Sequence, residues 1–355
     1  MEKANKNKID KTEKRTQGQA IIKKPETLEV RKKLGKIVVI CGPTATGKSD
    51  LAVLIAKKFN GEVISADSRQ VYKGLDLGSG KITKKEMQGV PHFMLDVADP
   101  KKIYTVDKFS KDALKIAQGI LDTNKTPIIC GGSGMYIDAL VDGIQFPNVP
   151  IDKKLRKELS TFTTENLYEK LMSLDQNRAD QLKNDGGGQF NKVRIIRSIE
   201  IATKIGAVPP LISKANFDAI FIGLDFDDKT IKDRILLRIR SRMKKGMLAE
   251  ARNLHKNGLK YKRMHELGLE YGHLASLLEG KISKEEFENA LALDIWHFVK
   301  RQRTWFKRRS EILWFKPSKT NFKKIENTVK KFLDHKNKGE EDIKITNGKK
   351  RSTIN

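Results

Sequence analysis

The sequence contains little cysteine: Cys41 and Cys130 are the only two in 355 residues. We expect no zinc finger, because the two cysteines lie far apart in the sequence and His273 and His297 lack the spacing of metal ligands. Each cysteine ends an apolar run just before a glycine turn. Because no secretory signal precedes them, we expect reduced thiols and a cytoplasmic protein.

Long hydrophobic runs are also absent. No run approaches the roughly 18 apolar residues of a membrane-spanning helix, so we expect no membrane association. Residues 1–15 mix acids with lysines and contain no apolar segment, unlike a secretory signal or a mitochondrial transit peptide. We interpret residues 1–35 as a disordered basic arm.

Acidic residues are scarce relative to basic ones, and the formal net charge is +27. Residues 1–36 and 316–355 each carry twelve basic and five acidic residues, which leaves +13 on the middle of the chain. We therefore expect the folded body itself to attract polyanions. A solubilising surface explains the same excess equally well, because net charge defines no site. Residues 316–355 are expected to form a frayed basic tail.

Short apolar runs alternate with amphipathic segments in the first half of the chain. The pattern predicts strands over residues 36–41, 62–65, 92–97 and 126–130. It predicts helices over residues 49–59 and 106–121. Such an order is typical of a parallel sheet that binds ligands at the carboxyl ends of its strands.

The pattern changes near residue 147. Residues 151–205 show leucines at helical spacing, 218–226 reads as a strand, and 229–256 and 283–310 read as helices. The sequence therefore predicts an α/β fold: a P-loop nucleotide-kinase-like parallel sheet flanked by helices, with an inserted all-helical domain. The core would comprise residues 36–147 and 216–315, and the insertion residues 148–215.

Residues 42–49 read GPTATGKS and match the phosphate-loop pattern G-x-x-x-x-G-K-[ST] between a predicted strand and a predicted helix. Backbone N–H groups of residues 44–49 are expected to surround a phosphate at the helix N-terminus. Lys48 would add positive charge, and the Ser49 hydroxyl would hold Mg²⁺. The predicted phosphate-binding residues are Gly42, Pro43, Thr44, Ala45, Thr46, Gly47, Lys48 and Ser49.

The acid that a nucleotide hydrolase needs on its metal is not evident in the sequence. The strand over residues 126–130 ends in Cys130-Gly131-Gly132, without a carboxylate. Asp96 could serve, but it could equally be a turn residue. The signal for a phosphate loop is therefore strong, and the signal for hydrolysis is weak.

Residues at the ends of two further predicted strands could take part in catalysis or in ligand binding. Asp67 follows the strand over residues 62–65, where it could act as a general base, hold Mg²⁺ or form an Asx turn. The stretch GGSG over residues 131–134 allows close approach of a ligand to the backbone, or forms a plain tight turn.

Basic residues cluster on three predicted helices. Arg194 and Arg197 share a face near Lys192, as phosphate contacts or as a solvated surface. A denser cluster comprises Arg234, Arg238, Arg240 and Arg242. The stretch KRQRTWFKRR over residues 300–309 could contact RNA, or its aromatic side chains could enter the core, which we favour for Trp305.

These stretches together resemble the tRNA dimethylallyltransferase family, also called the isopentenyl-tRNA transferase family. The order and spacing of the matching stretches hold from about residue 36 to residue 315. In chain order they are GPTATGKS, VISADSRQVYKGLDLGSGK, VPHFMLDVADP with YTVDKF, GGSGMYIDAL, RSIEI and KRQRTWFKR.

The resemblance implies a tRNA prenyltransferase that moves a dimethylallyl group from dimethylallyl diphosphate to N6 of adenosine 37 and releases diphosphate. It implies that residues 42–49 hold the diphosphate with Mg²⁺, and that Asp67 takes the proton from the amine. Ser133 stands where the family usually has threonine and would keep the catalytic hydroxyl. The partner would be the anticodon stem-loop of tRNA. The sequence does not define an oligomeric state, and we take a monomer as the default.

By the same resemblance, the flipped adenosine and its neighbours contact Asp67, Ser68, Arg69, Gln70 and Ser133. The insertion would contact tRNA through Arg156, Arg194 and Arg197. Arg238 matches an arginine expected at the donor diphosphate, with Arg242 as a rival because the local spacing differs by one residue.

Three stretches depart from the family pattern, and they bear on the predicted anticodon contacts and the choice of tRNA. They are Phe190-Asn191, Gly268-Leu269-Glu270 and Ile295-Trp296. Two other functions compete with the transferase: a P-loop kinase for nucleotides or small molecules, and an RNA-binding protein whose site is inactive. The kinase gives no reason for the basic helices, and intact Lys48, Ser49 and Asp67 argue against inactivity.

Overall fold

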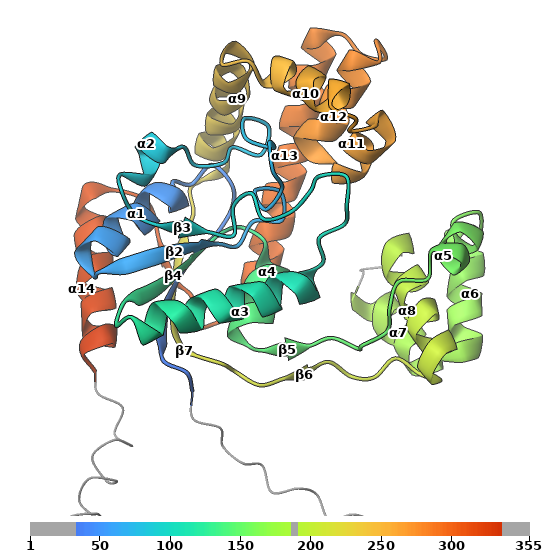
Figure 1. The fold of residues 1–355 in the computed structure, drawn as a ribbon, viewed down its shortest axis with the longest axis horizontal. Helices are drawn as coiled ribbons and strands as arrows, with labels where there is room; N and C mark the ends of the chain where they lie inside the picture. Colours follow the sequence, from blue (N-terminus) through green and yellow to red (C-terminus); the bar gives the residue numbers. More distant parts are fainter. Residues whose placement is uncertain (1–32, 186–190, 336–355) are drawn as a thin grey trace, which may run out of the picture. The chain divides into compact units, whose positions relative to one another are not determined.

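The computed structural model describes residues 33–185 and 191–335. Its main sheet has six parallel strands in the order β3-β2-β4-β1-β7-β8 (Figure 1). The strands are β1 Lys36–Cys41, β2 Gly61–Ser65, β3 His92–Phe93, β4 Thr126–Cys130, β7 Asp218–Leu224 and β8 Leu313–Phe315. The predicted parallel α/β fold is therefore confirmed, with β1 between β4 and β7.

Alternating side chains of β1 are buried on the two faces of the sheet, because successive residues of a strand point to opposite sides. Val38 and Ile40 pack in a cluster with Leu51 and Ile55 of α1 (Lys48–Lys58). Ile37 and Val39 belong to a larger cluster on the other face. That second cluster includes side chains of α3 (Val106–Asp122), α4 (Gly134–Val141) and α13 (Lys284–Phe306).

Residues 153–185 and 192–205 form four helices with an apolar cluster of their own, which includes Leu159, Leu167 and Ile199. These helices are α5 Lys153–Leu159, α6 Thr164–Leu174, α7 Gln176–Asp185 and α8 Lys192–Ile205. The strands β5 (Ile144–Gln145) and β6 (Ile212–Ser213) pair antiparallel where the chain enters and leaves this segment. Asn191 caps α8 by accepting from the N–H groups of Val193 and Arg194; Phe190 lies outside the described residues.

A helical segment separates β7 from α13. Its helices are α9 Asp228–Lys244, α10 Met247–Lys256, α11 Tyr261–Leu267 and α12 Leu269–Leu278. The predicted single helix over residues 229–256 is wrong in one respect. It is divided at Gly246, whose φ of 100° does not fit an α-helix.

Two other expectations fail. The strand predicted over residues 92–97 is only the two-residue β3, because Met94 and Asp96 adopt left-handed φ angles of 63° and 57°. The tail predicted from residue 316 onward instead begins with α14 (Lys319–Asp334), whose Ile325 and Val329 are fully buried against the sheet. Ile325 and Val329 lie four residues apart and so share one side of the helix, but the many basic residues around them obscured this pattern in the sequence.

Residues 1–32 of the arm predicted over residues 1–35, and the end of the chain from residue 336, lie outside the described residues. Within residues 33–185 and 191–335, no helix is both long enough and apolar enough to cross a membrane.

Candidate functional site

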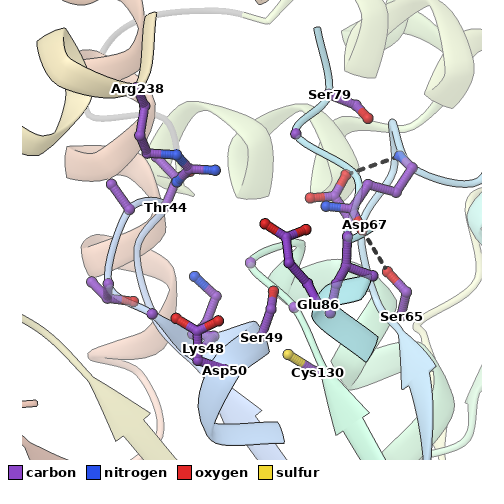
Figure 2. A pocket seen from close by; sticks show the side chains of 18 of the residues that line it. Thr44, Lys48, Ser49, Asp50, Ser65, Asp67, Ser79, Glu86, Cys130 and Arg238 are labelled. Carbon is purple, nitrogen blue, oxygen red and sulfur yellow. Dashed lines mark hydrogen bonds between the residues drawn. The ribbon is translucent and has the colours of Figure 1, made fainter. Parts of the chain in front are cut away.

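A cavity of about 280 Å³ lies at the carboxyl ends of β1, β2 and β4. Its lining includes residues 44–50, then Ser65, Asp67 and Gln70 at the end of β2, and parts of residues 79–86. Residues 130–132 at the end of β4 and side chains of helices α9 and α13 complete most of the remainder. Figure 2 shows Arg238 and Thr44 on one side of the cavity, and Ser79 and Asp67 on the other. The fold thus brings the predicted phosphate loop and the predicted base to one site.

The loop over residues 42–49 begins where β1 ends and leads directly into α1. Gly42 has a φ of 130°, and a Cβ atom at this position would lie 2.3 Å from the carbonyl oxygen of Leu224. Only glycine therefore allows the loop to turn so closely against β7. The Thr46 hydroxyl donates to the carbonyl of Pro43 across 2.9 Å and ties the loop to itself.

Three cationic side chains approach this loop. The Lys48 Nζ atom donates to the carbonyl of Pro43, and burial lowers the pKa of Lys48 to about 8, with Arg238 acting in the same direction. Arg238 lies 3.4 Å from the Thr44 hydroxyl, and burial together with Arg242 lowers its pKa to about 10. Arg234 donates to the carbonyl of Ala45 across 2.5 Å. Half-buried positive charge of this kind is costly to the free protein and favours an anionic ligand.

The two candidate arginines for the donor differ in position. Arg238 lines the cavity, whereas Arg242 is absent from its lining. Arg242 instead lies 3.4 Å from the Glu270 carboxylate and 3.3 Å from the carbonyl of Gly78. Burial raises the pKa of Glu270, and Arg242 opposes that rise. The geometry favours Arg238 as the arginine facing the cavity.

Asp67 forms the Asx turn considered for it and also lines the cavity. Its Oδ1 atom accepts from the backbone N–H of Arg69 at 2.8 Å and of Gln70 at 3.3 Å, which forms an Asx turn. The same side chain lines the cavity. The turn fixes one oxygen, and no hydrogen bond within the described residues engages Oδ2. The turn thus holds the Asp67 carboxylate at the cavity through Oδ1 alone.

Ser133 and its neighbours support this turn. The Ser133 hydroxyl accepts from the backbone N–H of Ser68 across 3.0 Å, and Ser133 is not among the residues that line the cavity. Gln70 lines the cavity and accepts from the Ser65 hydroxyl at 3.2 Å. The Arg69 guanidinium lies 3.2 Å from the carbonyl of Ser68. Ser133 therefore positions the segment that carries Asp67.

Sequence reasoning missed Gln302, which is 5% exposed and lines the cavity. Its Oε1 atom accepts from the Thr44 N–H, and its Nε2 atom donates to the Gly132 carbonyl, each across 2.9 Å. In the sequence, the only signal for Gln302 was its place within the basic stretch KRQRTW. Trp305 of the same stretch is half-buried and donates from Nε1 to Asp138 across 2.7 Å, which fits a structural role.

The end of β4 carries no acid, as predicted, and Cys130 lines the cavity there. Burial raises the pKa of Cys130 to about 12, so its thiol is protonated. Asp96, the alternative metal acid, pairs with Lys81 and does not line the cavity. Neither position supplies the carboxylate of a nucleotide hydrolase.

The predicted magnesium ligand fits the chemistry of the cavity in part. Ser49 is exposed and lines the cavity, together with the oxygen-bearing side chains of Asp50, Asp67 and Glu86. Across residues 33–185 and 191–335, no three histidine, cysteine or acidic side chains are grouped as metal ligands. Mg²⁺ commonly keeps several waters and binds through one or two protein groups plus phosphate oxygens, so one hydroxyl is compatible with it.

Of the three arginines in the insertion that are predicted to contact tRNA, two pair with a buried glutamate and one is exposed. Arg156 and Arg197 both form ion pairs with Glu200, which is 2% exposed. Although burial opposes it, hydrogen bonds from both arginines lower the pKa of Glu200. Arg194 is exposed on α8 and makes no ion pair with a described residue. None of the three lines the cavity.

Comparison with known proteins identifies relatives over most of the chain. Residues 70–309 match the family model described as IPP transferase. A tRNA dimethylallyltransferase of Thermoanaerobacter sp. (strain X514) is 36% identical over 312 residues, which cover 84% of this chain and 97% of the relative. A tRNA dimethylallyltransferase 2 of Treponema denticola is 40% identical over 277 residues, which cover 76% of this chain and 91% of the relative.

A solved structure is similar to this chain over most of its length. The crystal structure of the tRNA isopentenylpyrophosphate transferase from Bacillus halodurans is 30% identical and superposes with a TM-score of 0.64. The match covers 84% of this chain and 97% of the crystallised chain.

Proposed function

The chain belongs to the IPP transferase family of tRNA dimethylallyltransferases, and we propose that it transfers a dimethylallyl group from dimethylallyl diphosphate to tRNA. The acceptor is the N6 amine of adenosine 37, beside the anticodon, and diphosphate is released. The observation that carries this proposal is the shared cavity: Asp67 lies across it from the phosphate loop and Arg238.

The donor half of the cavity suits a diphosphate. Lys48 and Arg238 provide positive charge, and the N–H groups at the start of α1 provide hydrogen-bond donors. Charge builds on the departing diphosphate as the bond between its oxygen and the allylic carbon breaks. Cations fixed in a partly buried site stabilise that charge without reorganising.

The acceptor half suits an amine that must lose a proton. The N6 nitrogen forms a bond to the allylic carbon, and its proton passes to the free oxygen of Asp67. The Asx turn holds this carboxylate, and Ser133 holds the turn. Ser68, Arg69 and Gln70 follow Asp67 directly and would contact the adenosine, which must leave its stack to enter the cavity.

We propose Mg²⁺ as the cofactor, held by the Ser49 hydroxyl and by oxygens of the donor. When bound, it would neutralise charge on the diphosphate. The residues of this chain then bind and orient the donor through Lys48 and Arg238.

The anticodon stem-loop of tRNA is the proposed partner. The exposed Arg194 is the first candidate on the insertion to contact a phosphate. Arg156 and Arg197 must either release Glu200 or present the remaining donors of their guanidinium groups. We further propose a monomer acting in the cytoplasm, where tRNA is modified.

Purified protein, Mg²⁺, radiolabelled dimethylallyl diphosphate and a bulk bacterial tRNA pool test the proposal. Label should enter tRNA with wild-type protein and fail to enter with Asp67→Ala. No label in any tRNA, together with tight binding and turnover of ATP, would contradict the transferase and support a kinase. The relatives do not favour that alternative.

A further inference from the structure

The loop over residues 76–80 forms one side of the cavity and is held by helices outside it. Ser79 and Gly80 of this loop line the cavity. The outer side of the loop faces Glu250 of α10 and Tyr271 of α12, and neither side chain lines the cavity. These contacts play no part in the chemistry described above, although they determine where one side of the site lies.

Glu250 accepts four hydrogen bonds, and three of them come from consecutive backbone groups of the loop. Its Oε2 atom accepts from the N–H groups of Asp76 and Leu77, at 3.2 and 2.7 Å. Its Oε1 atom accepts from the Gly78 N–H at 3.0 Å and from the Tyr271 hydroxyl at 2.7 Å. Hydrogen bonds to an ionised acceptor are about twice as strong as neutral ones, so one carboxylate fixes the whole turn.

Close packing of the loop against the Tyr271 ring adds to the hold of these hydrogen bonds. Tyr271 is 1% exposed, and a Cβ atom on Gly78 would lie 2.5 Å from the Cζ atom of its ring. The loop backbone therefore rests directly on the tyrosine whose hydroxyl completes the set of donors to Glu250. A displaced loop would lose both the ring contact and the hydrogen bonds.

The inner side of the loop contacts the arginines of α9. A Cβ atom on Gly80 would lie 3.0 Å from Nη2 of Arg238 and 1.7 Å from Nη2 of Arg242. Arg242 also donates to the carbonyl of Gly78. One end of the loop is thus bound by Glu250, and its other end, at Gly80, lies against Arg242 and Arg238, so the position of the loop limits where Arg238 can lie.

We propose that Glu250 is a positioning residue for the donor half of the site: it holds residues 76–80 against Arg238. The proposal rests on the proposed function, because it takes the ligand at Arg238 to be the donor diphosphate. Glu250 acts through the loop and touches neither substrate. Its loss should therefore weaken donor binding and leave tRNA binding intact.

The test compares Glu250→Gln with Glu288→Gln, a matched loss of charge at a carboxylate that pairs with Arg240 on the surface. Calorimetry with inorganic diphosphate and Mg²⁺ measures donor-site affinity, and initial rates give KM for the donor and for tRNA. We expect Glu250→Gln to weaken diphosphate binding and raise the donor KM about tenfold. The tRNA KM and the rate at saturating donor should stay near wild type, and Glu288→Gln should change neither constant.

Diphosphate affinity in Glu250→Gln equal to that in Glu288→Gln would overturn the proposal. So would equal losses of donor and tRNA affinity, because those indicate general damage. A second variant, Tyr271→Phe, keeps the ring on Gly78 and removes one donor to Glu250. It should weaken diphosphate binding less, and non-additively with Glu250→Gln; unchanged affinity would overturn the proposal even if Glu250→Gln does not fold.

The readouts separate this proposal from the proposed function. Diphosphate binding by wild-type protein does not depend on which RNA accepts the prenyl group. Wild-type protein that binds diphosphate but labels no tRNA would contradict the proposed acceptor alone. The comparison between Glu250→Gln and wild type would still decide the role of Glu250.

Discussion

The backbone N–H of Thr44 donates to Oε1 of Gln302 across 2.9 Å, although 258 residues separate them. Gln302 in turn donates to the carbonyl of Gly132, so one side chain of α13 joins the loops that follow β1 and β4. A Cβ atom on Gly132 would lie 2.2 Å from Nε2 of Gln302, so the contact leaves no room for a side chain at residue 132. The predicted phosphate loop is thus held in place by a helix from the far end of the chain.

Replacing Gln302 by alanine should destabilise the protein and loosen the phosphate loop. The Gly132 carbonyl would lose its partner in a buried place, at a cost of about 1–3 kcal/mol, and the partly buried Thr44 N–H would lose its partner at the edge of the cavity. Urea denaturation should show a lower free energy of unfolding, and calorimetry should show weaker diphosphate binding. Lys300→Ala, two residues away and exposed, is the control; equal behaviour of the two variants would refute the link.

Arg238 and Arg242 should differ in their effect on the donor. Arg238→Ala removes the guanidinium that faces the cavity, and a charge-assisted hydrogen bond of about 1.5–3 kcal/mol corresponds to roughly 10- to 100-fold in affinity. Arg242→Ala should weaken the donor less, because Arg242 faces Glu270 and Gly78. Titration of both variants with diphosphate compares their losses of affinity. A larger loss of affinity in Arg242→Ala would mean that Arg242, and not Arg238, contacts the donor.

Stability of the helices over residues 153–205 should fall in acid because of Glu200. Its pKa is lowered in the folded protein, so its contribution is complete above the pKa of the unfolded chain, about 4.3, and is lost as pH falls through the lowered value. Denaturation followed by circular dichroism at pH 6 and pH 3 should show the advantage of wild type over Glu200→Gln shrinking. An advantage that stays constant with pH would exclude Glu200 as the source.

Helix α14 should be required for stability even though its composition suggests a tail. Ile325 is fully buried against the sheet, and Ile325→Ala should lower the free energy of unfolding by about 2–5 kcal/mol. Lys323→Ala, on the exposed side of the same helix, should change it by about 0.5 kcal/mol or less. Thermal or urea unfolding of the two variants measures the difference, and similar small effects would mean that α14 contributes little.

The strands β1, β2, β4 and β7 and the phosphate loop were predictable because their signals are local. The apolar runs that form β1 and β4, and the glycines and lysine of residues 42–49, need no information from distant parts of the chain. Asp67 and Arg238 were identified through their motifs, and the parallel topology explains why strand ends meet at one cavity.

The supporting contacts could not be predicted, because they join residues far apart in sequence. Gln302 lies 170 residues from Gly132, and Glu250 lies 172 residues from Gly78. No spacing rule relates such positions. The short β3 and the helix α14 were missed for a different reason. Left-handed angles at Met94 and Asp96 end an apolar run that reads as a strand, and many lysines conceal the apolar side of α14.

The central claim is that Asp67 and the phosphate loop act on one donor and one adenosine. The most direct measurement incubates radiolabelled dimethylallyl diphosphate with two tRNA transcripts that differ only at position 37, adenosine in one and guanosine in the other. Wild-type protein should label the adenosine transcript alone, and Asp67→Asn should slow that reaction about 10²- to 10⁴-fold while diphosphate binding is unchanged. Label in both transcripts or in neither, or an unaffected rate in Asp67→Asn, would contradict the account.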